Sequence, residues 1–167
     1  MTDQPFTHLD QAGRARMVDV SGKPVTVRTA TAEALVRCPP QVVTHLRDQT
    51  VPKGDVLAVA RIAGIAAAKR TPDLLPLAHV IGVHAVEVEL AVVDDGVHIS
   101  ATVRAADRTG VEMEALTCAS VAALAVVDMV KGLDKAVEIA VVRLVAKSGG
   151  RSGDWRRPEP GHSPDQR

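Results

Sequence analysis

Aromatic side chains are almost absent from this chain of 167 residues, which has one Trp, one Phe and no Tyr. Proteins that bind single-stranded nucleic acid without sequence preference stack the bases on aromatic rings. The formal net charge is zero, so no overall positive field attracts the chain to nucleic acid or to an anionic membrane. We therefore expect neither a nucleic-acid partner nor a membrane partner.

Two further absences restrict the compartment and the kind of site. Cys38 and Cys118 lack the CxxC or Cys/His spacing of a zinc site and suggest no disulfide framework. No run of about 18 apolar residues occurs, and the N-terminus lacks a signal-peptide hydrophobic region. We expect a cytoplasmic protein without a metal site of its own.

The chain has the length of one ordinary domain, and 46% of its residues are hydrophobic. We predict a mobile N-terminal segment over residues 1–15, a single domain over residues 16–150, and a flexible C-terminal tail over residues 151–167. The tail has too few apolar groups to offset the entropy of ordering it.

Hydrophobic periodicity predicts alternating strands and helices. The expected strands and helices are a strand within 25–36, a short helix near 41–48, a longer helix to about 70, strands at 86–90 and 97–103, a long helix from 109, and a strand over 137–146. The residues Asp94-Asp95-Gly96 indicate a hairpin turn. This order predicts an α+β fold, the ferredoxin-like β-α-β-β-α-β antiparallel sheet with helices on one face, plus an extra short helix. Either the open sheet face or the small-residue helix surface could contact a partner.

The long helix carries charges at both ends. Thr109 and Glu112 form a T-x-x-E capping box, which predicts a helix start there. Steps of three and four residues then place one set of residues on a single stripe. The stripe consists of Glu114, Thr117, Val121, Leu124, Asp128 and Lys131. Taken alone, these charges fit a solvated ion pair and favourable first-turn carboxylates as well as a functional site.

Four ordered segments of the chain resemble a known enzyme family. They are residues 17–21 (MVDVS), 53–71 (KGDV, ARIAGI and AAKRT), 109–131 (TGVEMEAL and DMVK) and 147–150 (KSGG). In this order they are similar to cyclic pyranopterin monophosphate synthase, the C protein of molybdenum cofactor biosynthesis. The resemblance covers roughly residues 7–153 and makes residues 16–150 a catalytic domain.

The resemblance implies a phosphorus-oxygen lyase. Its reaction converts 3',8-cyclo-7,8-dihydroguanosine 5'-triphosphate to cyclic pyranopterin monophosphate and pyrophosphate. Asp128, Lys53 and Lys131 take the catalytic positions. The implied substrate-binding residues are Leu77, Ala78, His79, Glu112, Met113 and Glu114. Lys69 and Lys147 are candidate phosphate contacts, because an ammonium group can hold a phosphate. No tightly bound cofactor is implied, and magnesium could accompany the triphosphate.

The chain departs from the family pattern in one loop. Ala78 stands where the family has Cys, and Val80 stands where it has Pro. These departures motivate an alternative function, a non-catalytic oligomeric nucleotide- or pterin-binding protein diverged from the family. Retention of Lys53, Asp128 and Lys131 argues for the enzyme. An unrelated ferredoxin-like domain is a remote third interpretation.

The spacing of charges along the long helix bears on assembly. Glu114 and Asp128 lie about 21 Å apart on one helix, at 1.5 Å per residue. Either one of them contacts a remote end of the ligand, or two subunits share each site. The resemblance implies the second arrangement, in a homohexamer built as a trimer of dimers with sites between subunits.

Overall fold

The computed structural model of the chain describes residues 9–10 and 12–158. Its strands are β1 (Thr26–Arg37), β2 (Val83–Val93), β3 (Gly96–Asp107), β4 (Glu138–Ser148) and β5 (Trp155–Arg156). Its helices are α1 (Pro40–Arg47), α2 (Val56–Ala68), α3 (Thr71–Leu74) and α4 (Glu112–Val130). The predicted β-α-β-β-α-β order is confirmed, with α1 as the extra short helix.

The five strands form one antiparallel sheet in the order β2-β3-β1-β4-β5. Along β1, Ala32 and Ala34 are fully buried, whereas Thr31 and Glu33 alternate with them and point to the other face. Thr31 hydrogen-bonds across to Thr102 on β3 at 2.9 Å between hydroxyl oxygens. Along β1, the face toward the helices is therefore apolar and the opposite face carries polar side chains.

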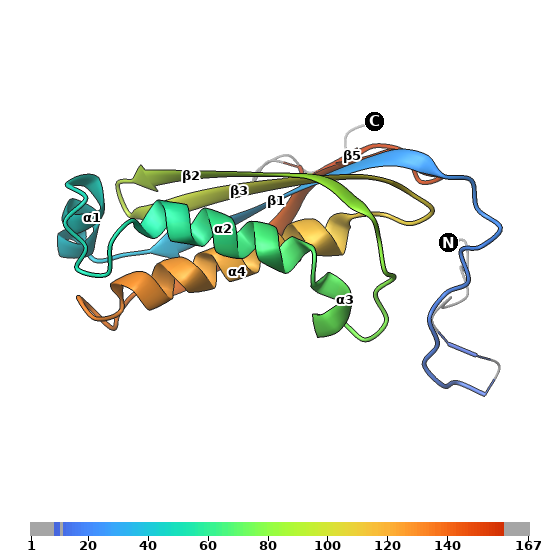
Figure 1. Ribbon diagram of the computed structural model, residues 1–167, viewed down its shortest axis with the longest axis horizontal. Helices are drawn as coiled ribbons and strands as arrows, with labels where there is room; N and C mark the ends of the chain where they lie inside the picture. Colours follow the sequence, from blue (N-terminus) through green and yellow to red (C-terminus); the bar gives the residue numbers. More distant parts are fainter. Residues whose placement is uncertain (1–8, 11, 159–167) are drawn as a thin grey trace.

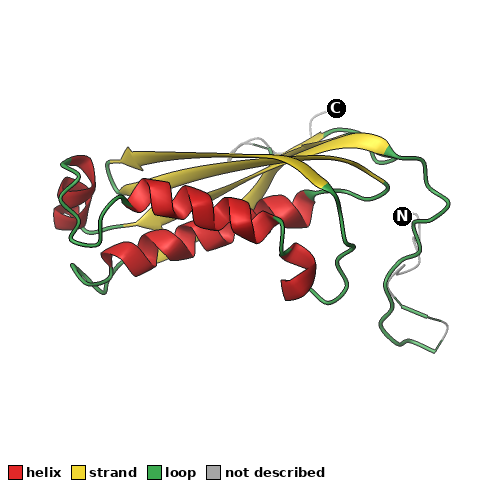
Figure 2. Cartoon of the chain, in the orientation of Figure 1, coloured by secondary structure: helices red, strands yellow, loops and turns green. Residues whose placement is uncertain are grey.

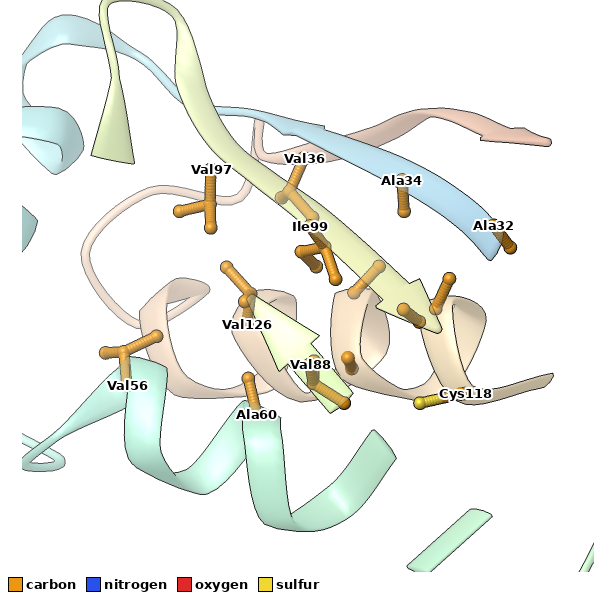
Figure 3. Packing of buried hydrophobic residues seen from close by; sticks show 14 of the residues in the cluster. Ala32, Ala34, Val36, Val56, Ala60, Val88, Val97, Ile99, Cys118 and Val126 are labelled. Atoms are coloured by element: carbon orange, nitrogen blue, oxygen red, sulfur yellow. The ribbon is translucent and has the colours of Figure 1, made fainter. Parts of the chain in front are cut away.

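The two long helices, α2 and α4, cover the apolar face of the sheet (Figures 1 and 2). Valines of both helices and of β2 and β3 fill the layer between them (Figure 3). Gly64 on α2 allows the helices to approach closely, because a Cβ there would lie 3.0 Å from the Cys118 carbonyl oxygen and 3.1 Å from its Sγ. Small residues at this crossing fix how α2 and α4 lie relative to each other.

Helix α4 is long and apolar enough to cross a membrane by length and composition alone. Half of its most apolar window is buried inside the structure, against the sheet and α2. Residues such as Ala119, Ala123 and Val126 are completely buried in that layer. Helix α4 is thus the central helix of the core.

The predicted capping box at the start of α4 is wrong. The helix begins at Glu112 with Val111 as its N-cap, and no side chain caps it. The Glu112 carboxylate instead folds over Gly110, where a Cβ would lie 1.8 Å from Oε2. It also lies 3.9 Å from the Lys147 ammonium group. The carboxylate therefore makes these contacts instead of the predicted reciprocal cap.

Two elements appear where the sequence predicts none. The single-turn helix α3 follows α2, and β5 pairs with β4 inside the stretch predicted as a tail. Residues 1–8, 11 and 159–167 of the two predicted terminal segments lie outside the described residues. The proposed domain boundaries stay a prediction.

Candidate active site

A carboxylate held between two lysines lies at the C-terminal end of α4. The Lys131 Nζ atom is 2.8 Å from Asp128 Oδ1, and the Lys53 Nζ atom is 3.2 Å from Asp128 Oδ2. Lys53 also donates a hydrogen bond of 2.7 Å to the Asp128 carbonyl oxygen. Carbonyls in the last turn of a helix lack partners within the helix and favour a cation. The predicted catalytic residues Lys53, Asp128 and Lys131 therefore form one group in space.

The loop before α2 brings Lys53 to this group. Val51 is buried and anchors the loop, and Asp55 caps α2 by accepting a hydrogen bond from the Ala58 N–H. Gly54 has a φ of 98°, a region that favours glycine, although a Cβ at this position would meet nothing within 4 Å. Glycine is thus needed here for its backbone angle and not for space around Lys53.

The two lysines control the protonation of Asp128. The hydrogen bond from Lys131 and then that from Lys53 lower the pKa of the Asp128 carboxyl below its ordinary value. Its side chain is 59% exposed, so a ligand can reach it. At neutral pH the group presents a carboxylate that can accept a proton, beside two cations that can neutralise phosphate charge.

A second group lines a cavity of about 410 Å³ at the other end of α4. Three short segments line the cavity, and all six predicted substrate-binding residues lie in its wall. The lining residues are Val18, Val20, Lys23, Leu77, Ala78, His79, Ile81, Thr109, Gly110, Glu112, Met113 and Glu114. The structure therefore brings together residues that are far apart in the sequence.

The N-terminal segment positions the histidine of this cavity. The His79 Nε2 atom lies 2.7 Å from the Val18 carbonyl oxygen. A carbonyl only accepts hydrogen bonds, so Nε2 carries the proton and donates it. Whenever the ring is uncharged, its Nδ1 atom is then a hydrogen-bond acceptor. His79 is thus oriented by the segment 17–21, for which no role was predicted from the sequence.

Glu114 is the buried acid of the cavity. Only 2% of its surface is exposed, and Oε2 has no hydrogen-bond partner among the described residues. Burial raises the pKa of its carboxyl, and the nearby carboxylates of Glu112 and Asp107 add to that rise. A buried carboxyl without partners is unfavourable in the free protein. Glu114 is part of the cavity wall, which makes a ligand bound there a candidate partner for this buried oxygen.

The two candidate phosphate contacts differ in position. Lys147 lies on β4 next to the cavity, 3.9 Å from the Glu112 carboxylate, and it hydrogen-bonds to the Ser152 hydroxyl. Lys69 is the exposed C-cap residue of α2 and belongs to neither group of residues. A lysine that the sequence interpretation missed is Lys23, which lies on the wall of the cavity directly after the 17–21 segment.

The departures from the family pattern affect the loop unequally. Ala78 lines the cavity, so the missing thiol alters the surface that a ligand meets. Val80 is 89% exposed and is not part of the cavity wall. The lost proline therefore changes the loop backbone rather than the binding surface.

The two groups occupy opposite ends of α4 (Figure 1). Glu114 is in the first turn and Asp128 in the last, which separates them by about 21 Å along the axis. Among residues 9–10 and 12–158, no cluster of three or more His, Cys, Asp or Glu side chains is arranged to hold a metal ion. Within one chain, the cavity and the charged group of Lys53, Asp128 and Lys131 are thus two separate sites.

Known proteins place the chain in a family. The MoaC family matches residues 17–150. A cyclic pyranopterin monophosphate synthase of Streptomyces coelicolor is 64% identical over 152 residues, which is 91% of this chain and 89% of that protein. Proteins of the same name from a Nocardioides species and from Geobacter metallireducens are 58% and 54% identical. The Nocardioides match covers 95% of this chain and 100% of that protein, and the Geobacter match covers 93% of this chain and 98% of that protein. With this match over most of its length, the chain belongs to the MoaC family.

Proposed function

We propose that the two groups of residues act together in the cyclic pyranopterin monophosphate synthase reaction of molybdenum cofactor biosynthesis. As a MoaC-family lyase, the protein acts on a nucleotide. The substrate that fits is 3',8-cyclo-7,8-dihydroguanosine 5'-triphosphate, with cyclic pyranopterin monophosphate and pyrophosphate as the products. The observation that carries the assignment is Asp128 held between Lys53 and Lys131 at an exposed helix end.

The reaction needs proton transfers and charge neutralisation. The purine ring opens by hydrolysis and recloses as a pyranopterin, and a ribose hydroxyl then attacks the α-phosphorus. The bond between that phosphorus and the bridging oxygen breaks, and pyrophosphate leaves with the negative charge. Asp128 accepts a proton from an attacking oxygen and Lys131 donates one where the ring opens, and proton transfer from the Asp128 carboxyl to Lys131 across their 2.8 Å contact restores both groups. The Lys53 and Lys131 ammonium groups stabilise charge on the phosphates.

The cavity supplies recognition of the base. The Glu114 carboxyl and the His79 ring are hydrogen-bonding groups in the cavity wall. A guanine-like ring presents an amino group and a ring N–H, and a carboxylate can accept hydrogen bonds from both. Lys147 and Lys23 lie close enough to the cavity to meet a phosphate of the same ligand.

The site requires a second copy of the chain. A triphosphate nucleoside cannot be held by one Glu114 and turned over by the Asp128 of the same chain, because about 21 Å of helix separates them. We propose a homo-oligomer with sites between subunits, as a hexamer built from three dimers. Light scattering at micromolar concentration is expected to give this mass, and a monomer would contradict the shared site.

Two further proposals concern the cofactor requirement and the cellular location of the enzyme. We propose that the enzyme has no resident cofactor and that magnesium enters with the triphosphate. We also propose a cytoplasmic location, where nucleotide substrates are made.

A single-turnover experiment tests the function. The enzyme is mixed in excess with the cyclised nucleotide, and pyrophosphate and pterin formation are followed by mass spectrometry. The native chain is expected to convert the substrate, and Asp128→Asn is expected to slow the step by about a hundredfold or more, as when a positioned acid or base is removed. Binding without conversion by the native chain would favour the non-catalytic alternative.

A further inference from the structure

The ammonium group of Lys147 has two neighbours of different chemistry. It donates a hydrogen bond to the Ser152 hydroxyl, and it lies 3.9 Å from Oε1 of Glu112. The second distance is too long for a direct hydrogen bond. The Lys147 side chain is 19% exposed, so its ammonium group has little freedom to turn toward water. Because an ammonium group has three donors, it can still donate to a ligand while it is held by Ser152.

The turn between β4 and β5 brings Ser152 back onto Lys147. Gly149 has a φ of 86°, a region that favours glycine. A Cβ at Gly149 would lie 2.2 Å from the Val27 carbonyl oxygen, so the turn is pressed against β1. The Asp154 carboxylate accepts a hydrogen bond of 3.2 Å from the Gly149 N–H and closes the turn. The turn thus has a defined shape that places the Ser152 hydroxyl.

The short strand β5 anchors the far end of this turn. Trp155 pairs with Lys147 across the two strands. The Arg157 N–H donates to the Val145 carbonyl oxygen at 2.7 Å, and the Arg157 Nε donates to the Leu144 carbonyl oxygen at 2.7 Å. The Arg157 guanidinium also lies 5.6 Å from the centroid of the Trp155 ring. The turn is therefore held at both ends, although β5 has only two residues.

The register of β4 separates two serines of the same turn. Residues directly opposite each other in an antiparallel sheet point to the same face. Lys147 is opposite Ala30, which is buried under the helices. Ser148 is opposite Thr29 and points to the other face of the sheet. Ser148 is thus a hydroxyl of the same turn that lies away from the Lys147 ammonium group.

The two neighbours of Lys147 have opposite consequences for an anionic ligand. A hydroxyl accepts a hydrogen bond from the ammonium group and leaves its positive charge in place. A carboxylate in direct contact would neutralise that charge, and a phosphate would then have to break the ion pair. Ser152 holds the ammonium group at 3.9 Å from Glu112, short of that direct contact.

From these contacts we propose that Ser152 is a positioning residue of the enzyme. Its hydroxyl keeps the Lys147 ammonium group available for a ligand phosphate and prevents Lys147 from closing onto Glu112. The identity of the ligand, and the role of Lys147 as a phosphate contact, rest on the proposed function.

Steady-state kinetics of serine variants test the role. Ser152→Ala is expected to raise KM for the cyclised nucleotide by about 3- to 10-fold, because a hydrogen bond to a charged group is lost at an exposed position. Its kcat is expected to stay near the native value, since Lys147 is not among the residues that contact Asp128. Ser152→Thr retains the hydroxyl and is expected to keep the native KM. The matched control Ser148→Ala removes a hydroxyl from the same turn and is expected to leave both parameters unchanged.

A double-variant comparison separates positioning from a general effect on the loop. In the Glu112→Gln background Lys147 has no carboxylate to close onto, so adding Ser152→Ala is expected to raise KM by a smaller factor than it does in the native background. If Ser152 only stabilised the turn, the same factor would be found in both backgrounds. An equal factor would therefore overturn the proposal.

Binding of inorganic pyrophosphate, measured by calorimetry, gives a readout that does not require turnover. The native protein is expected to bind it, Ser152→Ala to bind it about 3- to 10-fold more weakly, and Ser148→Ala to bind it as the native protein does. Native affinity in Ser152→Ala, or no binding by the native protein, would overturn the positioning role. If the native protein converts no nucleotide but Ser152→Ala alone weakens pyrophosphate binding, the proposed function fails and the positioning role stands.

Discussion

Replacing Glu114 by Gln is expected to make the protein more stable and less able to bind its substrate. Glu114 is 2% exposed, and its Oε2 atom has no partner among the described residues. Gln has nearly the same shape and cannot ionise, so the desolvation penalty of a buried carboxylate disappears. If Glu114 contributed only through the packing of its side chain, the isosteric change to Gln would not raise the free energy of unfolding.

The stability gain depends on pH, and its sign follows from the raised pKa. Burial raises the pKa of Glu114 above its ordinary value, so the folded state holds its proton to higher pH than the unfolded state does. The contribution of Glu114 is fully present below the unfolded pKa of about 4.5 and is lost as pH rises through the folded pKa. Each unit of difference corresponds to about 1.4 kcal/mol. The free energy of unfolding of Glu114→Gln does not decrease in this way. The variant should therefore be more stable than the native protein once the pH exceeds the unfolded pKa of Glu114.

Binding should change in the opposite direction. A carboxylate that accepts hydrogen bonds from a ligand contributes about 1.5–3 kcal/mol, and an amide presents a donor where an acceptor is needed. We expect the affinity for the cyclised nucleotide to fall by about 10- to 150-fold. The cavity shape is preserved, so the loss reflects hydrogen bonding rather than space.

The assay is urea unfolding of both proteins from pH 4 to pH 8, with ligand binding measured by calorimetry on the same preparations. The difference in unfolding free energy should be smallest near pH 4 and should grow with pH. A constant difference across this range, or a variant that is less stable at pH 8, would refute the reasoning that burial dominates at Glu114. Unchanged affinity would remove Glu114 from the binding site.

Four further changes test other contacts. Lys53→Ala should leave the fold intact and abolish turnover, measured by pyrophosphate release, because among the described residues the exposed lysine bonds only to Asp128. The double variant of Asp128→Asn with Lys131→Ala should lose little more turnover than Asp128→Asn alone, because the rate losses of groups that act as a unit are not additive. A double variant whose rate loss equals the product of the two single losses would show that the two residues act independently. Ala78→Cys should fold normally and change KM modestly, and a large drop in thermal midpoint would show that the loop packs differently. Gly64→Ala should destabilise by about 1 kcal/mol in denaturant unfolding, because overpacking against α4 exceeds the gain in helix propensity.

Local chemistry in the sequence was enough for much of the fold. The alternation in β2 and β3 and the Asp94-Asp95-Gly96 turn predicted the hairpin, and the structure has Gly96 with a φ of 150° where β3 begins. Helical periodicity predicted α2 and α4 to within a few residues. These signals are local, so each strand or helix can be recognised without the others.

The start of α4 shows where local signals fail. Thr109 and Glu112 have the spacing of a capping box, yet the helix begins at Glu112. The Glu112 carboxylate lies toward Lys147, a residue on β4 that the chain reaches only after the whole helix. A contact made through the tertiary structure thus replaced one that the local sequence predicted.

The candidate site, like the fold, was predicted from the sequence only in part. The residue types and the three-residue step from Asp128 to Lys131 were sufficient to pair those two side chains, because helical spacing fixes neighbours. Only the tertiary structure brought Lys53 from its loop onto Asp128, and the segment at Val18 onto His79. Sequence spacing carries no information on which distant backbone oxygen or ammonium group meets a side chain. Packing of α2, α4 and the loops decided these contacts, along with the burial that raises the pKa of Glu114.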